Sequence, residues 1–568
     1  MKDAISKLVT EAVIAAVAAG ELALAEVPDA GVERPRDSAH GDWATTVALR
    51  CAKAAGLAPK QVADVVAKHL AAHPDVAAVE IAGPGFINVR LSAAALQRVL
   101  VAARGQDRDF GSSRAGGGKR VQVEFVSANP VGPMHVGHGR WAALGDSMAR
   151  LLAHTGWQVE REFYINDAGV QMDLFAASVS ARYLEFCGAK VEFPENGYRG
   201  AYIADIAREI HEGEGTCWLD ASAESREAHF KEQAYRQVLA HLRRVLHDFG
   251  VDFDVWFSER TLHEAGADGG PSEVEAAIEE LRGRGFIYES EGAVWFRSTD
   301  FGDDKDRVLL KADGDYTYFA ADIAYHKDKF DRGFDRVINI WGADHHGYVP
   351  RMKAACSALG HEGKLDVVIG QLVNLFRDGE AVRMSKRTGE MVTFEELVEE
   401  VGADAARYWF LRRSTDQQVD FDIAVAKEQS ADNPVYYVQY AHARICSILR
   451  KGAGVEDAPA GIDVLADDLI GSGVDLSPLS ADAELSLMRK LDEFGEVVDV
   501  AARELSPYKL ARYAEDLAAV FHQFYSQCRV VDPAEPGLTA ARLFAVDATR
   551  RALRCALGLL GVSAPEAM

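Results

Sequence analysis

Hydrophobic and polar residues follow two different periods along the chain, and the change from one to the other marks the predicted elements. Residues 60–68 have apolar positions at helical spacing, whereas 79–82 and 86–91 alternate like strands around a Gly-Pro-Gly turn. The glycine-rich run 111–118 comes next. We therefore predict a small α+β domain over residues 1–107, followed by a linker.

A strand–helix–strand pattern begins after this linker and returns about 200 residues later. Its members are predicted as strands at 121–126, 157–165, 336–341 and 365–369 and a helix at 138–154. This layout is typical of a Rossmann-type sheet that binds a nucleotide where its strands end. We predict such a domain over residues 118–390, with a charged helical insertion at about 195–290.

From about residue 395 onward the pattern is helical. Ser506-Pro507 is a favourable helix start, and 451–482 is rich in Gly, Ala, Asp and Pro like a surface connection. We predict a helical segment over 391–430 and an all-α domain over 431–568, which makes the fold class multidomain α/β.

Length and composition agree with this division. A chain of 568 residues is too long for one hydrophobic core. No apolar run reaches the ~18 residues of a membrane span, and charges interrupt the first 20 residues, which read as a surface helix rather than a signal peptide. The seven cysteines include no Cys-x-x-Cys pair, so we expect neither zinc nor disulfides, and a reducing cytoplasm as the location.

The net charge of −25 argues against binding to nucleic acid mainly through phosphates. Net charge does not describe how charges are distributed, however, and 62 Lys and Arg residues are enough to line one face.

His135 and His138 flank Gly137 where the second predicted helix region begins. Backbone N–H groups and the helix dipole favour an anion there, and imidazole donors can stabilise charge that develops on a phosphate. Gly137 would allow a nucleotide to approach the backbone. The alternative is a helix N-terminus with incidental histidines.

Met384-Ser385-Lys386-Arg387 places two cations in a loop flanked by glycine. A point-charge lysine suits pyrophosphate, and a loop can close and reopen during a reaction. Taken alone, the segment is more typical of a solvated charged turn. Together with the histidine segment it indicates two walls of one ATP site.

A third segment, 342–348, follows the predicted strand 336–341. Gly342, Asp344 and His345 at a strand end suit contacts to ribose and adenine, although an ordinary turn is an even alternative. A metal site from Asp344 and the adjacent histidines is disfavoured, because neighbouring residues rarely point at one ion.

Several carboxylates indicate a cationic second substrate. Glu124 lies in a strand expected to be buried, and Tyr318 and Asp322 are four residues apart on one helical face. A guanidinium matches carboxylates in a bidentate fork. The competing interpretation for Asp322 is a surface ion pair with Lys327 or Lys329.

Tyr437, Tyr440 and Arg444 share a face of a predicted helix. They could stack on unpaired bases, although aromatic stripes at this spacing are more often part of a core.

Together these segments resemble the class I arginyl-tRNA synthetases, and the resemblance covers nearly the whole chain in family order. His135 to His138 is similar to the His-Ile-Gly-His signature of that class and Arg383 to Arg387 to its Lys-Met-Ser-Lys-Ser signature. The other similar stretches are 124–130, 164–169, 195–198, 342–348 and 433–444.

The resemblance implies roles for individual residues. ATP would contact His135, Gly137, His138, Gly342, Asp344, His345, Met384, Ser385 and Lys386; arginine would contact Glu124, Ser127, Asn129, Tyr318, Asp322 and, more faintly, Glu259. The tRNA would contact Phe86 and Asn88 of a module that meets the D-loop, and Tyr437, Tyr440, Arg444 and Met568 near the anticodon. Charge stabilisation would come from His135, His138 and Lys386.

The chain departs from the family pattern at Arg383 and Arg387, which replace a lysine and a serine of the loop signature. Some members lack the loop lysine and carry one before the histidine segment; here that place is Gly132 and Lys386 is present.

The resemblance implies activation of L-arginine by ATP with Mg²⁺, followed by transfer to tRNA(Arg), in a cytoplasmic and monomeric enzyme. Three alternatives stay open: a class I synthetase for another amino acid, with lysine the hardest to exclude; a tRNA-binding paralogue without activity; and a small-molecule adenylyltransferase.

Overall fold

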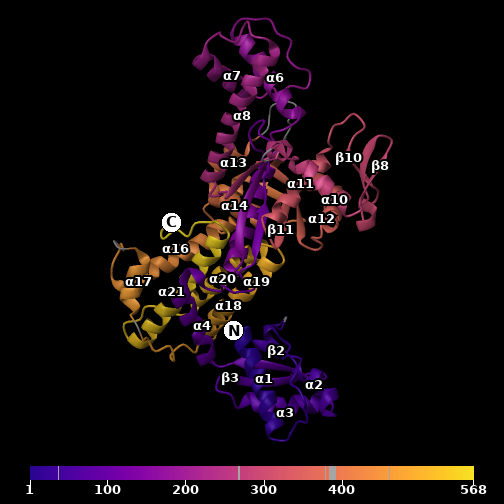
Figure 1. Cartoon of the computed structure of the whole chain (residues 1–568). Helices are drawn as coiled ribbons and strands as arrows, with labels where there is room; N and C mark the ends of the chain where they lie inside the picture. The colour runs from indigo at the N-terminus through magenta and orange to yellow at the C-terminus, as the bar shows by residue number, and fades with distance from the viewer. Residues whose placement is uncertain (36, 267–268, 378, 383–391, 459–460, 472) are drawn as a thin grey trace.

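The computed structural model describes residues 1–35, 37–266, 269–377, 379–382, 392–458, 461–471 and 473–568. Four parts surround a central sheet (Figure 1). A small domain lies at one end and a helical projection at the other, while a helical bundle and a β-containing lobe lie on opposite sides. No helix in these described ranges is both long and apolar enough to cross a membrane.

The N-terminal domain packs helices against a four-stranded antiparallel sheet of order β1-β2-β4-β3. The apolar residues Ile87, Val89 and Leu91 of β4 are buried on one face of the strand, in agreement with the period-2 pattern seen in the sequence. The elements are α1 (Lys2–Ala18), β1 (Val32–Glu33), β2 (Trp43–Thr45), α2 (Val47–Ala55), α3 (Pro59–Ala71), β3 (Val76–Ala82) and β4 (Phe86–Leu91).

Ion pairs join this domain to the C-terminal bundle. Arg34 donates to Asp492 at 2.7 Å and to Glu496 at 3.0 Å, and Arg489 donates to Asp42 at 2.6 Å. Helix α4 (Ala93–Gln106), which falls inside the predicted first domain, packs against the bundle helices α18 (Asp482–Asp492) and α21 (Pro536–Leu559). The N-terminal sheet is therefore fixed to the far end of the molecule from the helical projection (Figure 1).

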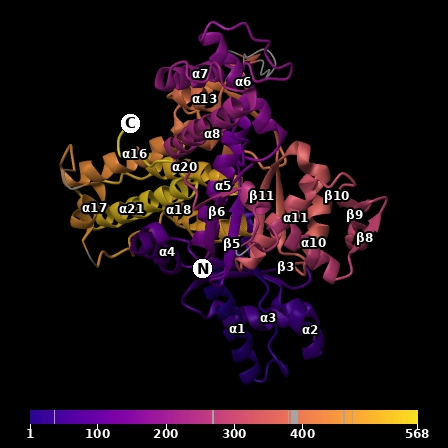
Figure 2. The same cartoon turned by 45° about the horizontal axis from the view of Figure 1, so that its top comes forward.

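The central sheet is entirely parallel, in the order β12-β11-β5-β6-β7. It confirms the predicted Rossmann-type fold, with a strand–helix–strand unit at each of its two halves. Figure 2 shows β5 and β6 between the bundle on one side and α11 on the other. The elements are β5 (Arg120–Glu124), α5 (Val136–His154), β6 (Gln158–Ile165), β7 (Val255–Ser258), α11 (Tyr318–Asp331), β11 (Arg336–Gly342), α12 (Val349–Ala358) and β12 (Leu365–Gly370).

The stretch predicted as a helical insertion has two parts, and a sheet strand separates them. Before β7 the chain forms the projection of α6 (Val170–Phe186), α7 (Ala201–Glu214) and α8 (Ala223–Asp248). Strand β7 is only four residues long and pairs in parallel with β6, and such a short apolar run carries little periodicity in the sequence. After it come α9 (Arg260–His263), α10 (Glu273–Gly283), β8 (Ile287–Ser290), β9 (Ala293–Phe296) and β10 (Arg307–Leu310).

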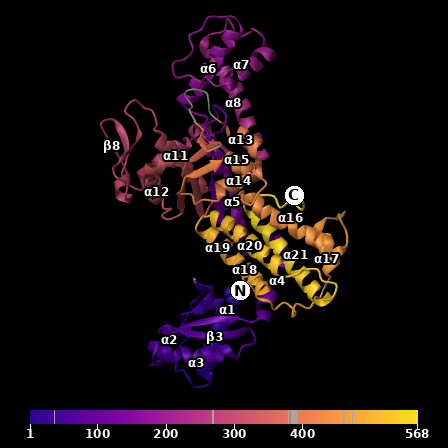
Figure 3. The same cartoon turned by 180° about the vertical axis from the view of Figure 1, so that it is seen from behind.

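A third small sheet and then helices complete the chain. Strand β13 pairs in parallel with β15 and antiparallel with β14. Figure 3 shows α14 between α13 and the helices of the bundle. The elements are β13 (Val373–Arg377), β14 (Glu380–Ala381), α13 (Phe394–Val401), α14 (Ala403–Leu411), β15 (Val419–Asp422), α15 (Ile423–Lys427), α16 (Pro434–Ala453), α17 (Ile462–Ile470), α18 (Asp482–Asp492), α19 (Phe494–Arg503), α20 (Tyr508–Gln527) and α21 (Pro536–Leu559).

Arg407 of α14 joins four parts of the molecule from a fully buried position. It is 1% exposed and pairs with Asp146 of α5, while its other donors reach the carbonyl oxygens of Phe249 at 3.1 Å and Leu560 at 3.3 Å. A side chain on Gly561 would collide with the guanidinium, because a Cβ atom there would lie 2.0 Å from Nη2. Arg407 thus links helix α5 to the ends of α8 and α21.

We expect Arg407→Met to lower the free energy of unfolding by about 3 kcal/mol, because a buried carboxylate loses its closest cation and two carbonyls lose a donor. Thermal denaturation would measure the change as a lower midpoint. The matched control is Arg150→Met, since Arg150 also donates to Asp146, at 2.8 Å, but is 37% exposed in its side chain. Equal midpoints for the two variants would contradict the expectation.

Candidate active site

The chain order of the central sheet reverses between β5 and β11, which is the position where open α/β sheets have their ligand-binding crevice. Strand β5 has β6, the next strand in the chain, on one side and β11 on the other. The loops that follow β5 and β11 therefore leave in opposite directions, and this switch point is where open α/β sheets bind their ligands. The loop after β5 leads to His135, and the segment 343–348 follows β11 directly.

His135 is the N-cap residue of α5, and His138 lies in its first turn. The backbone N–H of His135 donates to His138 Nδ1 at 3.2 Å, which leaves the ring proton of His138 on Nε2. The two imidazoles stack with their centroids 3.7 Å apart. A Cβ atom on Gly137 would lie 2.9 Å from His135 Cε1, so this glycine makes room for the imidazole.

Trp141 connects the histidine segment to the loop after β11. Its indole meets His135 and His138 edge-on, with centroids 5.8 and 5.2 Å away. The same ring lies over Gly342 and Gly370, which pair across β11 and β12; a Cβ atom would lie 3.1 Å and 2.3 Å from it. These glycines are needed because the indole covers the ends of both strands, and the motifs at 135–138 and 342–348 share one wall.

The cationic loop motif, including Met384, Ser385 and Lys386, falls outside the described residues, but both flanks are fixed to the start of α5. Downstream, Thr393 forms a bridge with His135, and the N–H of Phe394 donates to the Met134 oxygen at 2.9 Å. Upstream, the buried Arg140 donates to the carbonyl oxygen of Gln371 at 2.8 Å, just before β13. Described residues on either side of this segment, Gln371 upstream and Thr393 downstream, therefore contact the first turns of α5.

Three carboxylates from different elements surround Tyr164 at the end of β6. Burial, and then the charges of Glu259, Asp322 and Glu124, raise the pKa of this tyrosine. Glu259 follows β7 and is 5% exposed; Glu124 ends β5 and is 6% exposed. The pocket thus gathers negative charge from β5, β7 and α11, as expected for a cationic ligand.

Within the part of the chain that the structure describes, Asp322 forms no ion pair with a lysine. Tyr348 donates its hydroxyl to Asp322 Oδ2. Burial and the neighbouring carboxylates raise the pKa of Asp322 to about 7. The competing interpretation from the sequence fails, because Lys327 pairs with Asp331 and Glu280, and Lys329 turns inward to another residue.

The partner of Lys329 is Glu124 of β5. Lys329 is completely buried, and its ammonium donates to Glu124 Oε2 at 2.6 Å and to Asn339 Oδ1 at 3.1 Å. The second carboxylate oxygen of Glu124 accepts from the Ser127 hydroxyl at 3.0 Å. The costly unpaired carboxylate that the sequence implied is therefore neutralised from within the protein.

The backbone after β5 is strained where it enters the crevice. Val126 and Ser127 have φ values of 69° and 41°, a region that residues other than glycine seldom occupy. The strain turns Ser127 so that its hydroxyl meets both Glu124 and, at 3.2 Å, the backbone N–H of Tyr164. Asn129 reaches across to Gln171 of α6 at 2.7 Å. Tyr318, 69% exposed, lies at the mouth beside Gly169.

Asp344 and His345 are exposed at the other side of the crevice, with a separation of 3.7 Å between Oδ2 and Nε2. Over the residues that the structure describes, no three His, Cys, Asp or Glu side chains gather in a way that could hold a metal ion.

The predicted tRNA residues of the N-terminal domain lie on β4. Phe86 is half-buried, and Asn88 is 6% exposed between Ala44 of β2 and Glu80 of β3. Their contact with tRNA stays a prediction.

The predicted anticodon residues form an aromatic surface on α16. Tyr440 stacks on Tyr436 at 5.9 Å, and Arg444 lies over both Tyr440 and Tyr525, at 5.2 and 5.1 Å. Tyr437 meets His522 of α20 at 5.3 Å. Met568 is 54% exposed at the end of a segment that is held on α16 by bonds from His442 and Arg450. These side chains are half-exposed rather than core.

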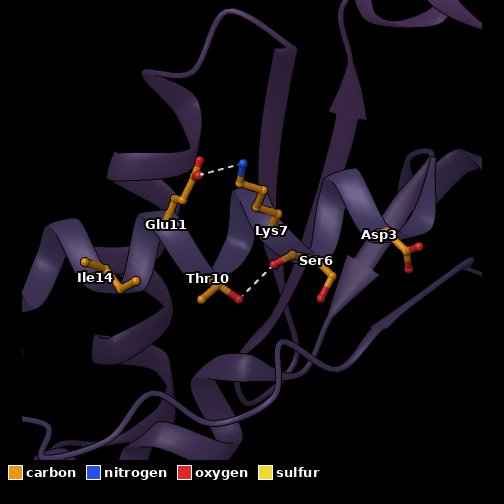
Figure 4. Close-up of a pocket in the computed structure, with 6 residues that line it drawn as sticks. All are labelled: Asp3, Ser6, Lys7, Thr10, Glu11 and Ile14. Carbon is orange, nitrogen blue, oxygen red and sulfur yellow. Dashed lines mark hydrogen bonds and ion pairs between the residues drawn. The ribbon is translucent and has the colours of Figure 1, made fainter.

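A surface hollow of about 460 Å³ lies far from the crevice, on the N-terminal helix (Figure 4). All its lining side chains come from one face of α1, and Lys7 and Glu11 among them pair at 3.7 Å. A hollow with a single wall cannot enclose a ligand, so it is no rival to the crevice.

Some residues of the site could not be recognised in the sequence. Trp141 and Arg140 lie in the apolar pattern of a helix, and Tyr164, Lys329 and Tyr348 have no spacing that marks them. Tyr164 and Tyr348 lie within stretches that carry the resemblance, and Arg140 and Trp141 follow the histidine segment closely, but nothing in the sequence assigned these residues a role.

Comparison with known proteins agrees with this geometry over the whole chain. The family described as "tRNA synthetases class I (R), catalytic domain" matches residues 99–445. The "Arginyl tRNA synthetase N terminal domain" matches residues 2–91, and the "DALR anticodon binding domain" matches residues 438–568.

Individual relatives agree as well. The arginine–tRNA ligase of Heliobacterium modesticaldum is 49% identical and covers 99% of this chain and 98% of its own. The arginine–tRNA ligase of Moorella thermoacetica is also 49% identical, and the match covers 100% of this chain and 99% of that protein. The solved structure of Thermus thermophilus arginyl-tRNA synthetase shares the fold, with a TM-score of 0.73 at 24% identity and full coverage of both chains. The chain therefore belongs to the class I arginyl-tRNA synthetases.

Proposed function

We propose that this chain attaches L-arginine to the 3′-terminal adenosine of tRNA(Arg) in two steps within the crevice between β5 and β11. The arginine carboxylate attacks the α-phosphorus of ATP, which forms arginyl-adenylate and releases pyrophosphate. A 2′-hydroxyl of the terminal adenosine then attacks the carbonyl carbon and releases AMP. No side chain acts as a nucleophile, so catalysis comes from positioning and charge stabilisation.

The observation that carries the proposal is the convergence of three distant segments on the first turns of α5. Trp141 covers the strand ends beside His135 and His138, and Thr393 bridges back to His135. ATP would place its adenosine near Gly342, Asp344 and His345 and its α-phosphate at the helix N-terminus.

The loop with Met384, Ser385 and Lys386 would bind the pyrophosphate. Mg²⁺ would enter with ATP and be held mainly by the phosphates, as is usual for this ion. We propose no zinc site, and we propose that the enzyme works in the cytoplasm as a monomer.

The pocket around Tyr164 supports arginine as the amino acid. Asp322 and Glu259 would hold the guanidinium, with Glu124 behind them, while Tyr318 lies at the mouth. Ser127 and Asn129 would orient the α-amino and carboxylate groups of the amino acid.

The test is ATP–pyrophosphate exchange with each amino acid in turn, with and without tRNA. We expect exchange with arginine only, and only when tRNA is present. Exchange with lysine would assign the enzyme to another amino acid, and no exchange or aminoacylation at all would indicate a tRNA-binding paralogue. Appreciable exchange without tRNA would contradict the dependence on tRNA.

Tyr440→Ala is expected to raise the KM for tRNA by about 10- to 100-fold with little change in kcat, because a stacked base contributes about 1–3 kcal/mol. Aminoacylation at varied tRNA concentration measures this. The control is Tyr288→Ala, which removes a half-buried tyrosine from β8, distant from α16. A tRNA KM that stays at the wild-type value would remove Tyr440 from the tRNA surface.

A further inference from the structure

Behind the substrate pocket a buried polar chain runs from β5 to α11. Lys329 donates to Asn339 Oδ1 at 3.1 Å, and the Asn339 amide lies 2.7 Å from His326 Nε2. His326 Nδ1 in turn lies 2.7 Å from the carbonyl oxygen of Asp322. Lys329, Asn339 and His326 are each no more than 3% exposed.

Lys329 gives this chain its direction. An ammonium has only donors, so it fixes the Asn339 oxygen toward itself and the Asn339 amide toward His326. His326 Nε2 must then accept from the Asn339 amide, and the proton on Nδ1 is donated to the backbone carbonyl oxygen of Asp322. Burial and the charge of Lys329 lower the pKa of His326 to about 3, which keeps this ring neutral. One cation therefore sets the orientation of every group up to the turn of α11 that bears Asp322.

Lys329 also sets the charge of the pocket. Of the three carboxylates near Tyr164, it neutralises Glu124, which leaves Asp322 and Glu259 for a ligand. The groups that face Asp322 are Glu259 after β7, Glu124 of β5, Lys329 of α11, Tyr164 of β6 and the hydroxyl of Tyr348. The charges of Glu259 and Glu124 raise the pKa of Asp322, and the charge of Lys329 lowers it.

We propose that Lys329 is a specificity-determining positioning residue, which neutralises the Glu124 carboxylate so that a substrate guanidinium, but not a primary ammonium, finds its full set of acceptors. This inference rests on the proposed arginine pocket. A planar guanidinium spreads its donors toward two carboxylates, Asp322 and Glu259. A lysine substrate presents a compact charge, and the buried carboxylate that would best accept it is already bound to an ammonium of the protein.

Lys329→Met keeps the volume and removes the charge. Glu124 then becomes a buried carboxylate that lacks its cation, and it raises the pKa of Asp322 without opposition. Because only ionised Asp322 binds a guanidinium strongly, we expect the pH midpoint of kcat/KM for arginine to move upward. We also expect the preference for arginine over lysine to fall by about ten-fold or more, since an ammonium now has a partner.

Two further variants are expected to shift the pH midpoint of kcat/KM in different directions, which a general loss of structure would not do. Glu124→Gln leaves Lys329 as an uncompensated cation beside Asp322, so the midpoint should move downward. The double variant removes both charges, and its midpoint should return close to that of the unchanged enzyme. Lys327→Met is the matched control: this lysine is two residues away on α11, pairs with Asp331 and Glu280, and should leave midpoint and preference unchanged.

The measurement is tRNA-supported exchange with arginine and with lysine across the neutral pH range. If Lys329→Met does not fold, Glu124→Gln and the double variant still test the direction in which the pH midpoint of kcat/KM moves. Midpoints that do not move in opposite directions, or equal losses for arginine and lysine, would overturn the role of Lys329. Absence of arginine-dependent exchange in the unchanged enzyme would instead refute the proposed function, so the two failures are distinguishable.

Discussion

Replacing His138 with alanine is expected to lower kcat for ATP–pyrophosphate exchange by about 10²–10³-fold, equivalent to about 3–4 kcal/mol of transition-state stabilisation. The geometry gives the reason. The ring is oriented by the N–H of His135 on Nδ1, at 3.2 Å, and by the edge of Trp141. Its Nε2 proton can therefore be directed at charge that develops on the α-phosphate.

Such an interaction is made mainly in the transition state, so the KM for ATP should change much less than kcat. The matched control is His154→Ala, which removes an imidazole from the last residue of the same helix, where Nε2 contacts the oxygen of Phe110. We expect this control to retain exchange activity. A His138→Ala enzyme whose main defect is a higher KM for ATP would show that the imidazole binds the ground state.

The sequence predicted the parts of the site that depend on local spacing. His135 caps a helix that begins at Val136 and His138 lies in its first turn, and Gly342 ends a strand whose predicted bounds differ by one residue from those observed. Thr393 starts α13 as an N-cap that is closed by Glu396, because a threonine three residues before a glutamate satisfies exposed N–H groups reciprocally. Signals of this kind lie within one helical turn and survive any tertiary arrangement.

The sequence could not predict partners that are distant along the chain. Lys329 could pair locally with Asp322, but the packing of α11 on the sheet turns it to Glu124, 205 positions earlier. Trp141 reads as one more apolar residue in a buried helix, and only the close approach of Gly342 and Gly370 shows what it covers. Strand β15, which pairs with β13 in a small sheet, was likewise hidden within a stretch that reads as helical, since it is only four residues long.

Asp322→Asn is expected to lower kcat/KM for arginine by about 10²–10³-fold, because loss of one partner in a desolvated charge pair costs about 2–5 kcal/mol. The substitution keeps the size of the side chain and an oxygen that can still accept the Tyr348 hydroxyl. The matched control is Asp331→Asn on the same helix, an exposed residue paired with Lys327. If the two variants lost arginine activity equally, Asp322 would not contact the substrate.

The pH dependence of the unchanged enzyme tests the same carboxylate without a mutation. Burial and the nearby Glu259 and Glu124 raise the pKa of Asp322 to about 7, so below neutral pH the empty pocket holds a protonated, uncharged group. Binding of a guanidinium must then displace that proton. We therefore expect kcat/KM for arginine to rise with pH up to about 7 and to level off above it, with a proton released on binding near neutrality. In Asp322→Asn this rising limb should be absent, because no proton remains to be displaced; an unchanged limb would assign the titration to another group.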